Sequence, residues 1–346
     1  MVVQHEKTNG VLSLQRFSRA AGGERPFVDL STIDPEPVEW IWQDRIPAGE
    51  LTVFDGDSGT NKSSLLVDLA ARVSTGRLMP DGTAGVHGGV VFLIGEDSVE
   101  KTVVPRLDAS GADRSKMLVL PSTVTIPDDL DQIRRAISHV DAKLVVVDTV
   151  MNFLGRNANA DQAVRQALIP LRELADRKSV GVLLVRHLTK SGGRHALYRG
   201  SGSIGIIATT RSALLVGQDP QDPGMRVLVH TKSNLGPIAP SLRFEPIASE
   251  DGIIHIEWRG ESDLKAEDIL SARTSSESKL HDAEEMLIEL LVQGPAEVGL
   301  IREAAAARSV SWRTVERAKR SLGVVTRHEG FGSGSVWLWS LPVDPS

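Results

Sequence analysis

Eight residues, GDSGTNKS, combine glycines, hydroxyls and a lysine in an arrangement that suits phosphate binding. They occupy Gly56–Ser63, directly after the apolar run LTVFD and before the apolar-periodic stretch SSLLVDLAARVS. A strand, a glycine-rich loop and a helix in this order place backbone N–H groups around phosphate oxygens. Lys62 is expected to reach the β- and γ-phosphates of a nucleoside triphosphate, and Ser63 to bind Mg²⁺. We therefore predict a P-loop site for ATP and Mg²⁺.

One position of this loop departs from the standard pattern, because Asn61 stands where a glycine usually precedes the lysine. The backbone there often needs a positive φ, which asparagine tolerates better than most residues, at a cost of about 1 kcal/mol. We expect Asn61 to weaken nucleotide binding modestly; the alternative is that its side chain blocks the phosphates. The predicted nucleotide-binding set is Gly56, Asp57, Ser58, Gly59, Thr60, Asn61, Lys62, Ser63 and Ser64.

Carboxylates follow two further apolar runs. The run KLVVV ends in Asp148, the expected Walker B acid at the magnesium site opposite Ser63. The run VVFLI leads through a glycine to Glu96 and Asp97. Glu96 is the first candidate for the base that polarises the attacking water, and Asp97 is its competitor. Asp97 would otherwise cap a helix expected to begin near Ser98.

A polar pair and a basic loop follow the run Val182–Val185. His187 is a candidate γ-phosphate sensor, and a surface histidine at a strand end is the alternative. The next stretch, TKSGGRHALYRGSGS, is glycine-rich and carries Arg194 and Arg199. Such a loop is expected either to track a phosphate backbone or to be a flexible surface loop.

Short β-branched runs that alternate with helical patterns must position these groups. This alternation predicts an α/β fold with a mostly parallel, doubly wound sheet, whose strand ends meet at one edge. The predicted strands are Leu51–Phe54, Val90–Ile94, Met117–Leu120, Leu144–Val147, Val182–Val185, Ser212–Val216 and Val227–His230.

Length and composition limit the class of protein. A chain of 346 residues is longer than one core of roughly 250–300 residues, so two domains are expected. The absence of cysteine excludes disulfides and thiolate zinc sites, and the nine histidines are not clustered. A net charge of -6 predicts no general attraction to nucleic acid. No long apolar run or export signal is present, so a cytoplasmic location without membrane association is expected.

The chain is expected to divide into a mobile arm at 1–36, an ATPase domain at 37–260, a linker at 261–279 and a small domain at 280–346. The last segment predicts two helices, a turn at Arg308 and a third helix capped by Ser311. Two short strands would follow as a hairpin. The three helices and this hairpin together resemble a winged helix-turn-helix domain. The third helix carries Arg313, Arg317 and Arg320 on one face, for duplex DNA or, alternatively, as a solvated face of a protein-contact module.

Several segments occur in an order that resembles the RepA-like AAA ATPases, relatives of plasmid and phage hexameric helicases with a RecA fold. They are EWIWQDRIPAGELTVFDGDSG, LIGEDS, VVVDT, RHLTK, LYRGSGSI and TKSNLGP. The resemblance implies the same roles for Lys62, Ser63, Glu96, Asp148 and His187. It further implies that residues 194–201 face a channel for single-stranded DNA in a ring, most often a hexamer.

The same resemblance implies that Lys232 reaches the nucleotide of a neighbouring subunit. Related rings often carry Lys-x-Arg there, whereas this chain has TKSN, so a guanidinium finger must come from elsewhere, with Arg211 as a candidate. A DNA helicase or translocase in replication is the leading interpretation. An ATP-gated DNA-binding regulator or loader and a recombinase-like repair ATPase are the alternatives, because all three share one active site.

Overall fold

The computed structural model describes residues 30–155, 161–188, 204–292, 294–329 and 336–342. Internal contacts divide the chain into two compact units, Met1–Ile269 and Leu270–Ser346. Each unit has hydrophobic clusters of its own. Each unit therefore has its own core, formed around a large sheet in the first unit and a small sheet in the second.

The first unit is an α/β domain with a nine-stranded sheet in the order β11-β10-β9-β8-β3-β7-β6-β4-β5. Neighbours from β8 to β5 are parallel, and those from β8 to β11 are antiparallel. The strands are β3 (Leu51–Gly56), β4 (Gly89–Ile94), β5 (Met117–Leu120), β6 (Ala142–Asp148), β7 (Gly181–His187), β8 (Ser212–Gln218), β9 (Arg226–Ser233), β10 (Ser241–Ala248) and β11 (Ile254–Ser262).

All seven predicted strands are present, and the mostly parallel α/β class is confirmed. The two strands that the sequence did not indicate, β10 and β11, are antiparallel and only partly buried. Such strands carry mixed polar and apolar residues instead of a continuous apolar run. Because β3, β4, β6 and β7 are parallel, their carboxyl ends share one edge, where the predicted site residues follow.

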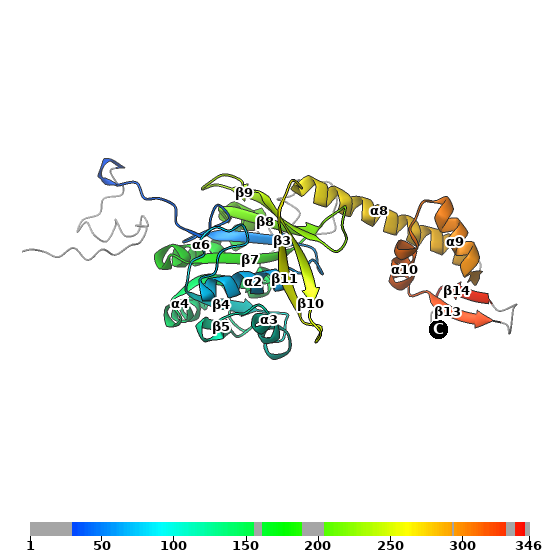
Figure 1. Cartoon of the computed structure of the whole chain (residues 1–346), viewed down its shortest axis with the longest axis horizontal. Coiled ribbons are helices and arrows are strands. Elements are labelled where there is room, and N and C mark those ends of the chain that lie inside the picture. Colours follow the sequence, from blue (N-terminus) through cyan, green and yellow to red (C-terminus); the bar gives the residue numbers. More distant parts are fainter. Residues whose placement is uncertain (1–29, 156–160, 189–203, 293, 330–335, 343–346) are drawn as a thin grey trace, which may run out of the picture. The chain divides into compact units, whose positions relative to one another are not determined.

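Helices cover both faces of this sheet, as the βαβ pattern requires. One face packs against α2 (Lys62–Thr75) and α3 (Val104–Ala109), and the other against α4 (Leu130–His139) and α6 (Asp161–Lys178) (Figure 1). The shorter elements are η1 (Leu30–Thr32), β1 (Trp40–Trp42), β2 (Ile46–Pro47), η2 (Val99–Val103), η3 (Arg114–Lys116), α5 (Val150–Phe153) and α7 (Ile204–Thr209).

The second unit combines three helices with a three-stranded antiparallel sheet ordered β12-β14-β13. The predicted third helix is present, with the Ser311 hydroxyl accepting a hydrogen bond from the Thr314 N–H at 3.3 Å. Val315 and Trp339 lie in its core. The elements are α8 (Ala266–Leu291), β12 (Ala296–Glu297), α9 (Val298–Ala307), α10 (Trp312–Ser321), β13 (Val325–Glu329) and β14 (Val336–Ser340).

Most of the expected linker at 261–279 lies in a helix. α8 runs without interruption from Ala266 to Leu291. The serine-rich stretch favoured a linker, yet these residues include neither glycine nor proline, and serine lowers helix stability only slightly. The helix also crosses the boundary between the two units.

Most of the predicted N-terminal arm lies outside the described residues; its last part, from residue 30, includes η1. None of the helices in the described ranges combines the length and apolar character needed to cross a membrane. The described side chains also include no group of three or more His, Asp or Glu suited to a metal ion.

Candidate active site

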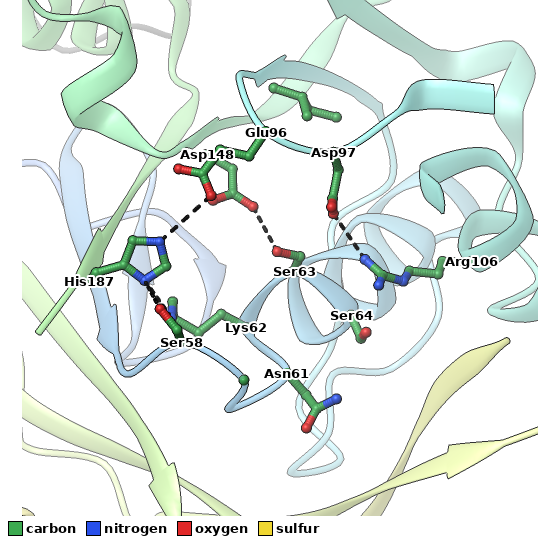
Figure 2. Close-up of a pocket in the computed structure, with 12 residues that line it drawn as sticks. Ser58, Asn61, Lys62, Ser63, Ser64, Glu96, Asp97, Arg106, Asp148 and His187 are labelled. Carbon is green, nitrogen blue, oxygen red and sulfur yellow. Dashed lines mark hydrogen bonds and ion pairs between the residues drawn. The ribbon is translucent and has the colours of Figure 1, made fainter. Parts of the chain in front are cut away.

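The phosphate loop lies between a fully buried strand and a mostly buried helix. β3 is buried along its whole length, and α2 begins at Lys62. Asn61 has φ 66°, in the left-handed region, as does Gly59 with φ 76°. The predicted backbone demand at Asn61 is therefore confirmed, and its side chain points away from Glu96 and Asp148 (Figure 2). The loop lines a cavity of about 310 Å³, large enough for a small-molecule ligand.

Lys62 folds back onto the loop that it belongs to. Its Nζ donates to the carbonyl oxygens of Gly56 at 2.8 Å and Asp57 at 2.7 Å, and the residue is 5% exposed. Burial lowers the pKa of Lys62, whereas surrounding carboxylates, Asp148 first, oppose that shift. An ammonium held on backbone carbonyls inside an anion-binding loop is well placed to turn toward phosphate oxygens.

Ser63 and Asp148 meet although they are 85 residues apart. The Ser63 hydroxyl donates to Asp148 Oδ2 at 3.0 Å, at the end of β6. Burial raises the pKa of Asp148, and the Ser63 hydrogen bond and the Lys62 charge oppose that change. The hydroxyl and carboxylate predicted to share one metal ion are therefore adjacent.

The two competing carboxylates have different partners. Glu96 Oε1 accepts from Thr149 Oγ1 at 3.4 Å and Asn152 Nδ2 at 3.3 Å, and its side chain is 58% exposed. Asp97 is engaged in an ion pair with Arg106 at 3.0 Å (Figure 2). Ser98, not Asp97, caps the next helical turn, with its Oγ accepting from the Lys101 N–H.

His187 reaches this group from the end of β7. The strand pairs with β3 so that His187 lies beside Gly56. Its Nδ1 is 3.5 Å from Ser58 Oγ and 3.4 Å from Lys62 Nζ, and its Nε2 is 3.8 Å from Glu96 Oε2. The five residues with predicted chemical roles at the phosphates, Lys62, Ser63, Glu96, Asp148 and His187, thus line one cavity.

Sequence reasoning missed an ion pair buried directly behind the loop. Arg186 donates through Nε and Nη2 to both oxygens of Asp55, each at 2.8 Å. Arg186 is 1% exposed and Asp55 3%. Burial raises the pKa of Asp55, and the Arg186 charge opposes that shift. The sequence signal was weak: Asp55 follows the apolar run Leu51–Phe54, and Arg186 follows the apolar run Val182–Val185.

Arg106 was also missed, although it lines the cavity from α3. Its sequence signal was weak, because a single arginine in a short helix beginning VPR is usually a surface residue. The ion pair with Asp97 is formed only because β4 and α3 bring residues nine positions apart to one wall.

Two predicted residues lie at the other end of the sheet. Lys232 Nζ donates to the carbonyls of Ile207 and Thr210, each at 2.7 Å, and burial lowers its pKa. Arg211 precedes β8, and its Nε is 3.8 Å from Glu50 Oε1. Neither residue lines the cavity of its own chain.

The predicted DNA contacts are only partly described. Arg194 and Arg199 lie outside the described residues. Arg313, Arg317 and Arg320 are all exposed on α10. Arg320 Nε donates to the Glu316 carbonyl at 3.2 Å, one turn earlier on the helix.

Comparison with known proteins decides the family. The AAA_25 model, described as an AAA domain, matches residues 20–193, which is half of the chain. The chain belongs to this AAA-domain family. The matched segment includes the loop, both carboxylate positions and His187, so the family assignment and the cavity concern the same residues. A RecA-like P-loop ATPase core is therefore established for the first unit.

Relatives of this AAA domain include DNA repair proteins. The RadA protein of Halalkalibacterium halodurans (strain C-125) is 26% identical over 187 residues, covering 53% of this chain and 37% of the relative. RadA of Bacillus subtilis (strain 168) is 28% identical over 148 residues, covering 42% of this chain and 29% of the relative. The similarity thus spans about a third of these relatives.

The donor set of this AAA domain fits Mg²⁺. The ion prefers hard oxygen ligands, and in nucleotide sites one or two protein groups are usually enough because phosphates and water supply the rest. Ser63 and Asp148 present such oxygens side by side, and they would hold it. When bound with ATP, Mg²⁺ would neutralise charge on the phosphates.

Proposed function

We propose that the chain is a RepA-like, ring-forming, DNA-associated motor that hydrolyses ATP. The observation that carries the proposal is the convergence of Lys62, Ser63, Asp148 and Glu96 on one cavity at the carboxyl edge of the sheet. Phosphoryl transfer to water depends mainly on positioning and charge stabilisation, which this set of groups can supply.

Each group has a distinct role in this proposal. Lys62 binds phosphate oxygens, and Ser63 with Asp148 holds the metal. Glu96 orients the attacking water, because it is exposed to the cavity whereas Asp97 is paired with Arg106. His187 lies within 4 Å of both Lys62 and Glu96, so it is placed to link the occupancy of the phosphate site to the base.

The position of Arg211 and Lys232 supports action across a subunit boundary. β8 runs parallel to β3, and Arg211 precedes the amino end of β8, whereas the loop follows the carboxyl end of β3. Five residues of strand therefore lie between the position of Arg211 and the start of the phosphate loop, which is roughly 16 Å at 3.3 Å per residue. Neither side chain reaches its own phosphate loop, so a finger role requires a neighbouring copy, and we propose a hexamer.

Arg211 is the better candidate for the finger. The Lys232 ammonium is bound by two carbonyls at 2.7 Å. The Arg211 side chain is 40% exposed, and its contact with Glu50 is long, at 3.8 Å, so its guanidinium is more accessible to a ligand. A guanidinium also matches a phosphate in two hydrogen bonds at once. In this scheme Lys232 stabilises the end of α7, close to the arginine.

DNA engagement is proposed at two places. The glycine-rich loop with Arg194 and Arg199 would face single-stranded DNA in the ring. The second unit would act as a winged helix, with Arg313, Arg317 and Arg320 of α10 on duplex DNA. Their exposure supports this assignment, because phosphate contacts need accessible cations.

A recombinase-like repair ATPase is the second candidate. It is favoured by the similarity to DNA repair protein RadA over half of this chain. Both candidates use the same cavity, so the active site does not separate them. They differ in whether hydrolysis separates the strands of DNA.

The deciding experiment measures ATP turnover with and without single-stranded DNA, beside unwinding of a forked duplex. A motor should show both stimulation and unwinding. Stimulation without unwinding would favour the repair ATPase or an ATP-gated loader. Lys62→Ala should lose nucleotide binding, and Glu96→Gln should keep binding but lose turnover.

Two controls test the assignments within this proposal. Asp97→Asn should retain more turnover than Glu96→Gln; the reverse order would move the base by one residue. Turnover per subunit should rise with protein concentration and fall in Arg211→Ala. A monomer with undiminished, concentration-independent turnover would rule out a finger acting across subunits.

A further inference from the structure

The hairpin of β13 and β14 exposes a tryptophan that the proposed site does not use. Trp337 is 56% exposed, whereas Trp339, two residues along β14, is 3% exposed. Alternate residues of a strand share one face, so both indoles lie on the side of the hairpin that packs against α10. There Trp339 completes the core with Trp312, their rings 5.4 Å apart. Trp337 extends the same aromatic row beyond the core.

A neighbouring ring holds Trp337 in place. His328 of β13 pairs with Trp337 in the strand register, and their ring centroids are 4.7 Å apart with planes inclined by 54°. A cross-strand contact of this kind limits the side chain's rotamers. A surface group that is already ordered loses less entropy when a ligand binds to it.

Cations lie among these aromatic rings. Arg302 lies over the Trp312 ring at 4.1 Å, and Lys319 over the Trp339 ring at 4.3 Å. The segment from Trp312 to Glu329 holds five Lys or Arg against two Glu, in a chain whose net charge is -6. Aromatic groups interleaved with cations favour a ligand that offers both flat rings and phosphates.

We propose that Trp337 stacks on an unpaired base of DNA beside the duplex held by α10. This inference rests on the proposed DNA-binding role of the second unit. An unpaired base offers its ring face directly, whereas inserting an indole into a stacked duplex costs unstacking energy. The hairpin therefore recognises a junction between paired and unpaired DNA, and α10 supplies the duplex contact.

The test compares full-length wild type, Trp337→Ala and Trp337→Phe on two labelled DNAs of the same duplex sequence, one blunt and one with a four-nucleotide unpaired tail. Trp337→Ala should bind the tailed DNA about tenfold more weakly, which is about 1.4 kcal/mol. Its affinity for the blunt duplex should change less than twofold. Trp337→Phe should retain most of the tailed-DNA affinity, because phenylalanine also stacks.

Fluorescence gives a second readout that assigns the effect to this residue. Tailed DNA should quench tryptophan emission in the wild type, and the quenching should shrink in Trp337→Phe. Far-ultraviolet circular dichroism, the thermal unfolding midpoint and basal ATP turnover should be unchanged in both variants, because Trp337 lies outside the core of its unit and outside the ATP cavity.

Three outcomes would overturn the proposal: equal affinity of wild type and Trp337→Ala for tailed DNA, an equal loss on both DNAs, or a change in oligomer size without a change in DNA binding. The last would make a second copy of the chain the occupant of this surface. Arg313→Ala/Arg317→Ala/Arg320→Ala is measured separately on blunt duplex. Unchanged binding there, with a Trp337 effect on tailed DNA, would refute the duplex contact of α10 and leave the stacking role in place.

Discussion

The two units of the chain place their chemistry-bearing residues in opposite environments. In the ATPase unit, charged groups such as Lys62, Asp148 and the pair of Asp55 and Arg186 are largely buried and held by several partners. In the second unit, the arginines of α10 and the indole of Trp337 are exposed. Substitution of a buried group therefore affects the stability of the residues packed around it. Substitution of an exposed group mainly affects binding of its ligand.

This contrast predicts how each unit responds to substitution. Removing one member of a buried, hydrogen-bonded set leaves an uncompensated charge or an unsatisfied group, and the folded state is destabilised. Removing an exposed cation changes the free energy of unfolding little, and it weakens the binding of a ligand that the cation contacts. The following predictions test that difference, beginning with the largest effect.

Arg186→Ala should lower the free energy of unfolding of the ATPase unit by about 3–5 kcal/mol, because it leaves the Asp55 carboxylate buried without its partner. Asp55→Leu/Arg186→Met should recover much of that loss, since it removes both charges. Urea unfolding followed in the ATPase unit gives the measurement.

The matched control for that experiment is Arg134→Ala on α4. Arg134 pairs with Asp131 at 3.0 Å, but both side chains are at least half exposed. Loss of this surface pair should cost less than about 1 kcal/mol. Similar costs at both pairs would contradict the distinction between buried and exposed charges.

His230 gives a pH-dependent form of the same test. Its Nδ1 accepts from the Ala239 N–H at 3.0 Å, its Nε2 lies 3.1 Å from Ser212 Oγ, and burial lowers its pKa from 6.5 to about 4. The unfolded chain therefore binds a proton more readily, so stability is complete above about pH 6.5 and falls as the pH drops toward 4. The loss at this residue is at most about 3 kcal/mol.

The measurement is unfolding free energy between pH 7 and 4 for wild type and His230→Gln. The variant should show a shallower decline with acid, whatever its stability at pH 7. His139→Gln, at an exposed position of α4, is the control and should follow the wild-type curve. Identical slopes for all three proteins would refute the role of His230.

Arg313→Ala/Arg317→Ala/Arg320→Ala should leave stability and basal ATP turnover unchanged while weakening duplex binding. If each arginine contacts one phosphate, the slope of log affinity against log salt should become shallower by about 2.7. A triple alanine variant of Arg134, Arg135 and Arg177, which are exposed on α4 and α6, removes the same number of charges and controls for net charge. An unchanged salt slope would make these arginines a solvated face.

The smallest effect is expected at Asn61, which tolerates its φ of 66° at the cost of limited strain. Asn61→Gly should tighten ATP binding by no more than about tenfold, which corresponds to 1.4 kcal/mol. Titration of both forms with ATP and Mg²⁺ measures this. If the wild type failed to bind millimolar ATP and the variant did bind it, the asparagine would instead be blocking the site.

Local sequence patterns were enough to predict most of the fold and the set of residues around the cavity. A continuous apolar run that ends in a glycine-rich loop or a carboxylate specifies a buried parallel strand and the group at its tip, because both depend on neighbouring residues alone. Asn61 is the clearest case, since its left-handed backbone follows from its place in the loop.

Only the tertiary structure decided which distant groups became partners. Asp55 with Arg186, and Asp97 with Arg106, depend on strand register and on helix placement that no local pattern encodes. The antiparallel strands β10 and β11 escaped prediction for a related reason: one-sided burial leaves no apolar run. Pairing between residues far apart in the chain is set by packing of the whole sheet. The Asp97–Arg106 ion pair, which supports the proposal of Glu96 over Asp97 as the base, was therefore visible only in the structure.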